Sequence, residues 1–219
     1  MHLHRALYLA ALLTLTIASV GVAQEPAPEG RPVLEIDAPR AIRVAMGGTP
    51  PEAWTAAIPG EAASDLRWPV QGGRLWRGYG THARLARTKR GTLRRLRRRH
   101  RHEGVDIGAA PGTPILAAND GLVIYSDNGM RGYGNVVVLV HRDASITLYA
   151  HCSAIYVAAG ALVTRGQVIA AVGATGLAHG PHLHFEWRVG GLTRDPLRHF
   201  VERPSPARTE EVEDDVNEP

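Results

Sequence analysis

Histidines gather in three short segments of this sequence, and their placement points to metal chemistry. The segments are 102–106 (HEGVD), 149–151 (YAH) and 180–186 (GPHLHFE). The last two segments fall in runs that we expect to form strands, where successive side chains alternate between the two faces. His182 and His184 therefore point the same way, about 7 Å apart along the strand. This pair could supply one metal ligand with a second imidazole beside it.

Catalytic zinc binds three protein ligands and keeps an open position for water. His102, Asp106 and one member of the His182/His184 pair supply nitrogen and oxygen donors of the required type. The spacing alone does not decide between His182 and His184. Zinc lowers the pKa of a bound water toward about 7, which makes hydroxide available at neutral pH. The segments together therefore predict a hydrolytic metal site.

Five other histidines are expected to lie on the surface or to be buried in the core with hydrogen-bond partners. A lone His-x-His pair is weak evidence for a metal site, because strands carry such pairs by chance. The three segments together, each among turn glycines, are much stronger evidence. The histidines assigned no role are His82, His100, His141, His179 and His199.

Composition and charge restrict the class of protein. The chain has 219 residues, of which 44% are hydrophobic and 21% charged, so it can bury a core and is not disordered throughout. One cysteine excludes an intrachain disulfide and a four-cysteine zinc module. The net charge is +4, but residues 82–101 hold ten Lys and Arg and no acidic residue. The basic character comes from this insertion, which argues against a domain-wide nucleic-acid surface.

Six apolar runs bounded by Gly, Asn and Asp predict strands in residues 65–201. No amphipathic helix is evident between them. We therefore expect an all-β domain, mainly an antiparallel sheet or sandwich. The predicted strands are 114–118, 122–126, 135–142, 146–153, 167–172 and 182–189.

The two ends of the chain differ from this domain in amino-acid composition. Residues 1–23 show a basic start, an apolar run and a small-residue site, which predicts a cleaved secretory signal peptide; an uncleaved membrane anchor is the alternative. Residues 24–64 hold seven of the 15 prolines and are interpreted as a linker with one short strand at 41–44. The acidic tail 202–219 is expected to be disordered. We expect a periplasmic or secreted protein without a stable membrane span after cleavage.

The three histidine segments resemble the signatures of the lysostaphin-type (LytM-like) zinc endopeptidases, which cut peptide cross-links in bacterial peptidoglycan. The turns at 108–114, 121–123, 132–135 and 166–167 match the family's intervening turns in order, and the resemblance covers roughly residues 68–196. It implies a largely antiparallel β-fold with the metal in a groove. It also implies Zn²⁺ bound by three ligands, with two further histidines as the catalytic pair. The implied ligands are His102, Asp106 and His184, and the implied catalytic residues are His151 and His182.

Three neighbours of these histidines need an interpretation. Glu186 shares the strand face of His182 and His184, so it could orient a ligand imidazole or face solvent. Alternation places Tyr149 on the same strand face as His151, and Tyr149 is expected to pack rather than to act on substrate. Cys152 should face the core, opposite His151, and behave as an inert hydrophobic residue rather than as a nucleophile.

The arginine-rich insertion 82–101 departs from the family pattern. Leu93, Leu96 and His100 fall at helical spacing, which allows a short and marginal helix. The insertion could be a solvated loop, a dock for anionic envelope polymers or lipids, or a cover over the groove held by the acidic tail. The docking interpretation is slightly favoured. A nucleic-acid partner fits poorly with an exported chain.

The sequence therefore predicts an exported zinc endopeptidase that acts on peptidoglycan stem peptides. A periplasmic setting favours a meso-diaminopimelate cross-link over a glycine bridge. Many relatives have lost ligands and act only as activators of other wall enzymes, so a non-catalytic peptidoglycan-binding activator is the alternative. Every position that matches the family motif is filled here, which favours the enzyme.

Overall fold

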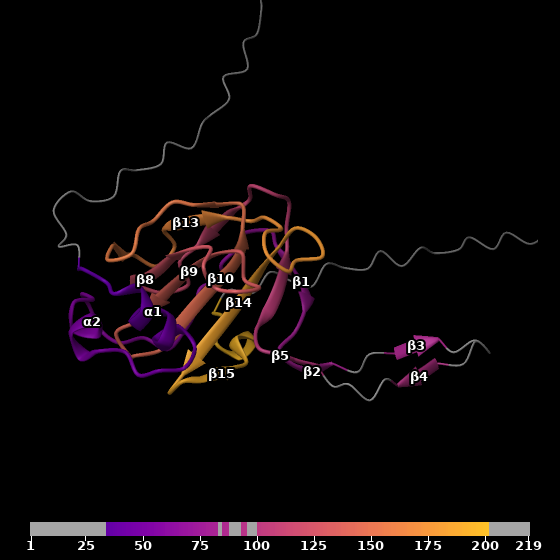
Figure 1. Cartoon of the computed structure of the whole chain (residues 1–219), viewed down its shortest axis with the longest axis horizontal. Helices are drawn as coiled ribbons and strands as arrows, with labels where there is room; N and C mark the ends of the chain where they lie inside the picture. The colour runs from indigo at the N-terminus through magenta and orange to yellow at the C-terminus, as the bar shows by residue number, and fades with distance from the viewer. Residues whose placement is uncertain (1–33, 83–84, 88–92, 96–99, 202–219) are drawn as a thin grey trace, which may run out of the picture. The chain divides into compact units, whose positions relative to one another are not determined.

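The computed structural model describes residues 34–82, 85–87, 93–95 and 100–201, drawn in colour in Figure 1. The predicted signal peptide 1–23 and the acidic tail 202–219 lie outside the described residues. Within the described ranges, no helix combines the length and apolar character needed to cross a bilayer.

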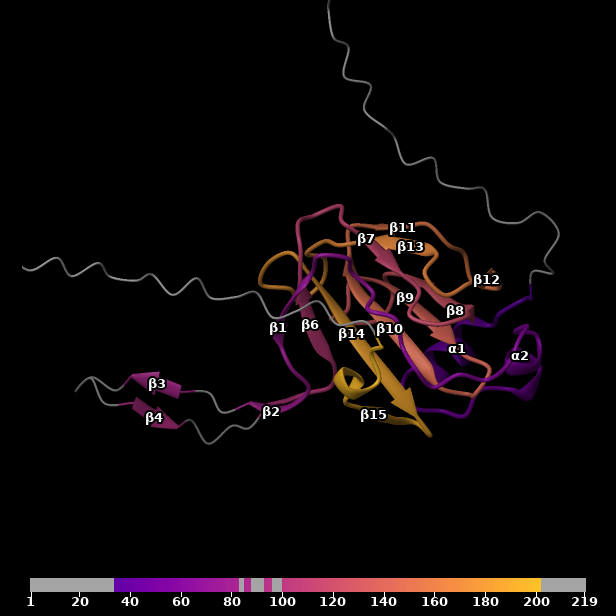
Figure 2. The same ribbon diagram turned by 180° about the vertical axis from the view of Figure 1, so that it is seen from behind.

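One large antiparallel sheet organises the domain (Figures 1 and 2). Its strands follow the order β1-β6-β14-β10-β9-β8-β12, and β15 extends β14 at one side. The all-β fold class is therefore confirmed. The strands are β1 (Arg74–Arg77), β6 (Val105–Gly108), β8 (Gly121–Asp127), β9 (Asn135–Val140), β10 (Ile146–Cys152), β12 (Leu162–Val163), β14 (His182–Val189) and β15 (Leu192–Arg194).

A smaller sheet packs on one face of the large one. It consists of β11 (Ala154–Ile155), β13 (Val168–Ala171) and β7 (Pro114–Leu116), in that order. The six strands predicted from apolar runs correspond to β7, β8, β9, β10, β13 and β14, with ends that agree within two residues. The apolar runs predict these strands well because most of their residues are buried.

The arginine-rich insertion contains paired strands rather than a helix. β2 (Gly80–His82) pairs with β5 (His100–His102), and β3 (Leu85–Arg87) pairs with β4 (Leu93–Arg95). The helix suggested by Leu93, Leu96 and His100 is therefore wrong for the described residues. A short helix without a packed face is marginal, and strand pairing satisfies the same backbone groups across the ribbon.

The expected linker is wrong for its described part, because residues 34–64 fold onto the sheet. α1 (Ala38–Ala45) replaces the strand expected at 41–44, and α2 (Glu52–Ala56) follows it. The Asp37 side chain caps α1 by accepting a hydrogen bond from the Arg40 amide at 2.8 Å. Ala41, Val44 and Ala45 are buried. Their i, i+3, i+4 spacing is the signal that the Pro-rich composition obscured.

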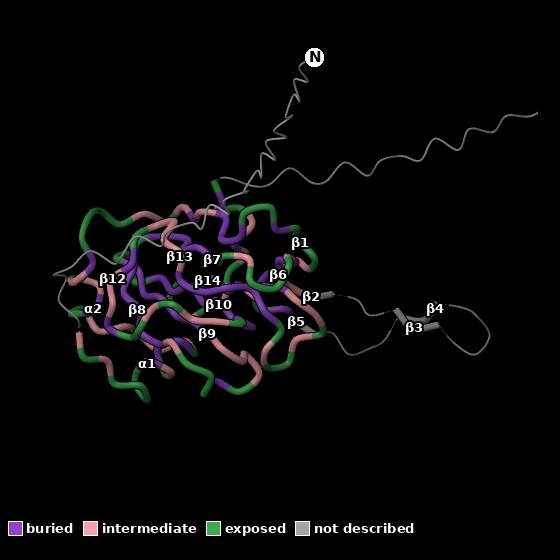
Figure 3. Tube along the Cα trace, turned by 90° about the horizontal axis from the view of Figure 1, so that it is seen from above, coloured by how far each residue is buried: buried purple, intermediate pink, exposed green. Residues whose placement is uncertain are grey.

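Buried residues, drawn in purple in Figure 3, form two clusters, and successive residues of the strands alternate between them, so one cluster lies on each face of the large sheet. Leu183 and Phe185 of β14 join the cluster under the smaller sheet. Leu148 and Ala150 of β10 join the other cluster, with α1 and α2. Ala150 pairs directly with His184, and paired residues point to the same face. The histidines of β14 therefore lie on the helix-covered face, beside the α1–α2 cluster. A last short helix, η1 (Pro196–Arg198), follows β15.

His141 is a buried core histidine, as expected. It is 1% exposed, donates from Nδ1 to the carbonyl oxygen of Asp120 at 2.7 Å, and has Nε2 2.8 Å from Oγ1 of Thr147. Burial lowers the pKa of His141. The folded state therefore binds fewer protons at this site than the unfolded chain, whose histidines titrate near pH 6.5.

We predict that acidification destabilises the domain through His141. Because the folded pKa is depressed, stability is present above about pH 6.5 and is lost as the pH falls toward the folded pKa. The slope of the free energy of unfolding against pH should be shallower in His141→Gln, by up to about 1.4 kcal/mol per pH unit. Urea unfolding of both proteins between pH 7 and 5 checks this. Equal slopes in the two proteins would contradict it.

Candidate metal centre

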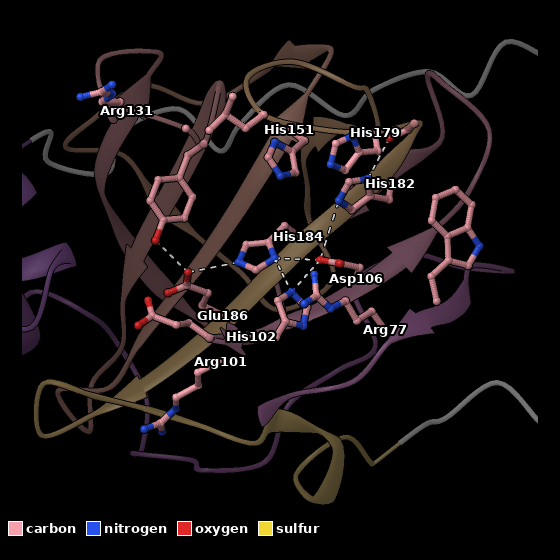
Figure 4. Close-up of a pocket in the computed structure, with 16 residues that line it drawn as sticks. Arg77, Arg101, His102, Asp106, Arg131, His151, His179, His182, His184 and Glu186 are labelled. Atoms are coloured by element: carbon pink, nitrogen blue, oxygen red, sulfur yellow. Dashed lines mark hydrogen bonds and ion pairs between the residues drawn. The ribbon is translucent and has the colours of Figure 1, made fainter. Parts of the chain in front are cut away.

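Strand register brings three potential ligands together. In the pairing of β6 with β14, Asp106 lies directly opposite His184. Oδ1 of Asp106 is 2.8 Å from Nδ1 of His184 and 3.0 Å from Nε2 of His102, at the end of β5. The two imidazole nitrogens are 3.2 Å apart. Figure 4 shows these three side chains converging on one point of the groove. The ligand atoms all lie within 4.8 Å of one another.

The donor set and its surroundings fit a divalent metal ion of the zinc type. Two imidazoles and one carboxylate are donors that zinc accepts. Nδ1 of His102 donates to the carbonyl oxygen of Gly78 at 2.8 Å, which leaves the lone pair of Nε2 for the centre. His184 faces the centre with Nδ1, because its Nε2 lies 3.1 Å from Oε1 of Glu186. Each imidazole thus has its remote nitrogen held and its near nitrogen directed inward.

The structure therefore brings together the three ligands implied by the family resemblance, and it favours His184 over His182. Nε2 of His182 is 3.7 Å from Oδ1 of Asp106, farther than either other imidazole. The roles of His102, Asp106 and His184 as ligands remain predictions.

Hydrogen bonds within this cluster shift the pKa values of its side chains. Burial alone would raise the pKa of Asp106, but hydrogen bonds with His102 and His184 outweigh it and lower that pKa. Burial alone would lower the pKa of His184, but its bonds to Asp106 and Glu186 raise it to about 9. A proton on His184 therefore supplies the positive charge that a bound metal ion would otherwise bring to this position. Metal binding would release that proton.

Glu186 anchors His184 from behind. Its carboxylate is buried, and Oε1 accepts a hydrogen bond from the Tyr133 hydroxyl at 2.8 Å. Oε2 accepts from Nε of Arg188 at 2.9 Å. Burial raises the pKa of Glu186, but contacts with His184 and Arg188 outweigh it and lower the pKa. Of the two interpretations of Glu186, the solvent-facing one is wrong, and the geometry supports an orienting role.

Sequence reasoning missed Tyr133 and Arg188. Arg188 shares the alternating face of His182, His184 and Glu186, so the strand pattern could have found it. Tyr133 lies in the turn between β8 and β9 and carried no comparable signal. Burial and the charge of Glu186 raise the pKa of the Tyr133 hydroxyl, which is therefore a stable donor at neutral pH.

The other two histidines form a second pair in the same groove. Nδ1 of His151 donates to the carbonyl oxygen of Thr175, and Nδ1 of His182 to that of Gly180, each at 2.8 Å. The ring centroids are 4.8 Å apart. In the neutral rings, each Nε2 is then an acceptor. Burial lowers the pKa of His151 to about 4, which keeps its ring neutral at pH 7.

Comparisons with known proteins identify the family of this domain. Residues 100–196 match the model of peptidase family M23. This part of the chain belongs to that family. A mutant catalytic domain of the prophage-encoded M23 protein EnpA from Enterococcus faecalis has a similar fold, with a TM-score of 0.51 and 28% identity, covering 61% of this chain and 96% of that one.

Two curated relatives carry an M23-like stretch within longer chains. The DD-carboxypeptidase/endopeptidase Mpg of Neisseria meningitidis serogroup B is 42% identical over 109 residues, or 50% of this chain and 24% of Mpg. The murein hydrolase activator NlpD of Escherichia coli is 39% identical over 102 residues, or 47% of this chain and 27% of NlpD. The matches thus span about a quarter of these relatives.

Tyr149 and Cys152 are both buried in the M23 domain. They lie in the same core cluster, whereas strand alternation predicts that they face opposite sides of the sheet. His151 adopts φ +65°, and the pairing of β10 with β9 is irregular between Tyr149 and Cys152. This break turns His151 into the groove and brings Cys152 into the same core cluster as Tyr149. The assignment of Tyr149 and His151 to one face is therefore wrong. The packing role of Tyr149 is confirmed: its hydroxyl accepts from the Ala118 amide at 2.8 Å.

The histidine cluster lies in a groove of about 850 Å³ on the M23 domain. Trp76, Tyr133 and Leu177 contribute to its walls, together with Arg77, Arg101 and Arg131. His179, to which the sequence assigned no role, is exposed on the groove wall. His199 packs against Trp187, with ring centroids 4.2 Å apart. Of the others, His82 and His100 pair with each other in β2 and β5.

We predict that Glu186→Gln weakens zinc binding to the metal-free M23 domain by about tenfold to a hundredfold. The substitution removes the charge that holds Nε2 of His184 and leaves Arg188 without its buried partner. Tyr133→Phe, which removes a single hydrogen bond to Glu186, should have a smaller effect in the same direction. Competition with a fluorescent zinc chelator measures both.

Thermal unfolding of the metal-free variants separates positioning from loss of fold. An unchanged zinc affinity in a folded Glu186→Gln protein would contradict the orienting role. Asp106→Ala is the reference for a lost ligand.

We predict that the Cys152 thiol does not react in the folded protein. Burial raises its pKa to about 12, and the side chain is fully buried. Iodoacetamide at pH 8 should label it only after unfolding, as measured by intact mass. Rapid labelling of the native protein, or loss of zinc-dependent activity in Cys152→Ala, would contradict the inert assignment.

Proposed function

We propose that this protein is an exported zinc-dependent endopeptidase that hydrolyses peptide cross-links of bacterial peptidoglycan. One observation carries the proposal: five groups with separate tasks face one groove. His102, Asp106 and His184 converge as a ligand set, while His151 and His182 lie beside it, each with Nδ1 held by a backbone carbonyl oxygen so that Nε2 is the nitrogen left to act. Membership of the M23 family supports a peptidase, and the names of Mpg and NlpD support murein as the material acted upon.

Each task in amide hydrolysis has a group in this chain. His102, Asp106 and His184 would hold the zinc ion, which would act as a Lewis acid that polarises a carbonyl and makes water nucleophilic at neutral pH. His151 and His182 can accept the proton of that water on Nε2 and deliver it to the leaving nitrogen. The carbonyl oxygens of Thr175 and Gly180 fix both tautomers, so the acceptor nitrogens need no rearrangement.

We retain the remaining assignments as parts of the proposal. Residues 1–23 act as a signal peptide, so the mature protein works in the periplasm or outside the cell. A meso-diaminopimelate cross-link is preferred to a glycine bridge. The insertion 82–101 serves as a dock for anionic envelope polymers or lipids, and nucleic acid is not a partner.

We predict that purified sacculi incubated with the zinc-loaded protein release cross-link fragments and that a chelator stops the release. His151→Ala and His182→Ala should lower the rate by about a hundredfold to ten-thousandfold at full zinc content. His199→Gln, which lies outside the groove, is the matched control and should retain activity. Mass spectrometry of the released muropeptides, with zinc measured on each variant, checks this. Near wild-type rates in both alanine variants would remove the pair from the mechanism.

The alternative function is a non-catalytic activator of other cell-wall hydrolases. The observation that favours it is the 39% identity to NlpD. A protein that carries stoichiometric zinc, releases nothing alone and increases release by an added murein hydrolase would support the activator over the enzyme.

A further inference from the structure

The acidic groups of the groove are already committed to partners. Three acidic side chains line it: Glu103, Asp106 and Glu186. Arg188 contacts two of them, Glu186 through Oε2 and Glu103 at 3.7 Å. Together with Arg188, the three acids carry a formal charge of −2. A divalent ion at the candidate metal centre would balance that charge.

Three arginines on the groove walls have no acidic side chain to balance their charge among the described residues. Arg77, Arg101 and Arg131 line the groove, and none of them has an acidic partner within ion-pair distance in the described part of the chain. The guanidinium of Arg101 donates to the Tyr79 hydroxyl and lies 5.5 Å from the centre of that ring, which are contacts with a neutral group. With the centre occupied by a divalent ion, the groove therefore presents a net positive wall.

These arginines come from different elements and surround the centre. Arg77 ends β1, Arg101 lies in β5, and Arg131 lies in the turn between β8 and β9. Figure 4 places Arg131 on one side of the histidine cluster and Arg77 and Arg101 on others. An extended peptide that crosses the centre therefore meets a guanidinium on each side of the bond held there. Arginine is suited to carboxylates, because its planar fork donates two parallel hydrogen bonds.

Apolar side chains line the same groove as the arginines. Trp76 is 58% exposed, and Gly108 gives it room: a Cβ there would come within 1.8 Å of the indole. Leu177, from the segment between β13 and β14, is 80% exposed on the groove wall. Such groups offer contact area to the methyl and methylene groups of a peptide, and a glycine bridge has neither side chains nor carboxylates to meet these walls.

We infer that the groove selects an acidic peptide with free carboxylates on both sides of the scissile bond, which Arg77, Arg101 and Arg131 hold from the different sides of the centre on which they lie. This inference rests on the proposed function and specifies its substrate class. Amidation of these carboxylates removes the charge and one acceptor oxygen of each, while the backbone is unchanged. The groove therefore distinguishes amidated from free stem peptides.

The test uses two synthetic cross-linked stem peptides with one backbone, one with free side-chain carboxylates and one with all of them as carboxamides. The zinc-loaded full chain should cleave the free form with a kcat/KM about tenfold to a hundredfold higher, with most of the difference in KM. The difference should shrink at about 0.5 M salt, because the walls are open to solvent.

Arginine variants test whether the preference for the free peptide comes from the groove walls. Arg77→Gln, Arg101→Gln and Arg131→Gln should each raise KM for the free peptide by roughly threefold to tenfold and leave the amidated peptide unaffected. The matched control is Arg194→Gln, which removes an exposed arginine of β15 outside the groove. Arg194→Gln should change the KM of neither peptide.

The outcomes separate this inference from the proposed function. Equal cleavage of the two peptides overturns the inference and leaves the endopeptidase intact. If the zinc-loaded protein cleaves neither peptide nor sacculi, the proposed function fails, and calorimetry of both peptides with the same protein then decides the inference. Tighter binding of the free form supports it, and equal dissociation constants overturn it.

Discussion

The candidate site depends on the register between β6 and β14. Because Asp106 is paired with His184 and Gly108 with His182, both histidines and the carboxylate project to the same face of the sheet. The opposite face of β14 is committed, since Leu183 and Phe185 are fully buried. A slip of one residue would exchange the two sets and place imidazoles in the core. The apolar residues next to the histidines of β14 thus fix the geometry of the candidate metal centre.

His102, the first candidate ligand, reaches this face because the chain turns tightly before β6. A Cβ on Gly104 would lie 2.2 Å from the carbonyl oxygen of Phe185, so only glycine allows the turn to press against β14. The contact places His102 over Asp106, where its Nδ1 can reach the carbonyl oxygen of Gly78. The HEGVD segment therefore combines two candidate ligands with the glycine that their geometry requires.

Much of this arrangement could be predicted from the sequence, and the failures have physical causes. Apolar runs located the strands, and alternation along 182–186 assigned the faces of β14, because that strand is regular. Alternation failed at His151, where a positive φ interrupts β10, and periodicity contains no information about such a break. Tyr133 could not be found, because its contact with Glu186 joins a turn to a strand 53 residues away. In the segment 38–45, a proline-rich composition outweighed a capped helical pattern that was present.

His184 and His151 illustrate how one residue type acquires two charge states within one groove. His184 is anchored by carboxylates on both ring nitrogens, which raises its pKa to about 9 and favours a positive charge at that place. His151 is anchored by a carbonyl oxygen, and burial lowers its pKa to about 4, so its ring stays neutral. A carboxylate partner stabilises a cation, whereas a carbonyl partner fixes the tautomer without that charge. The orienting groups behind His184 and His151, rather than the imidazoles themselves, therefore give these two rings opposite tendencies to hold a proton.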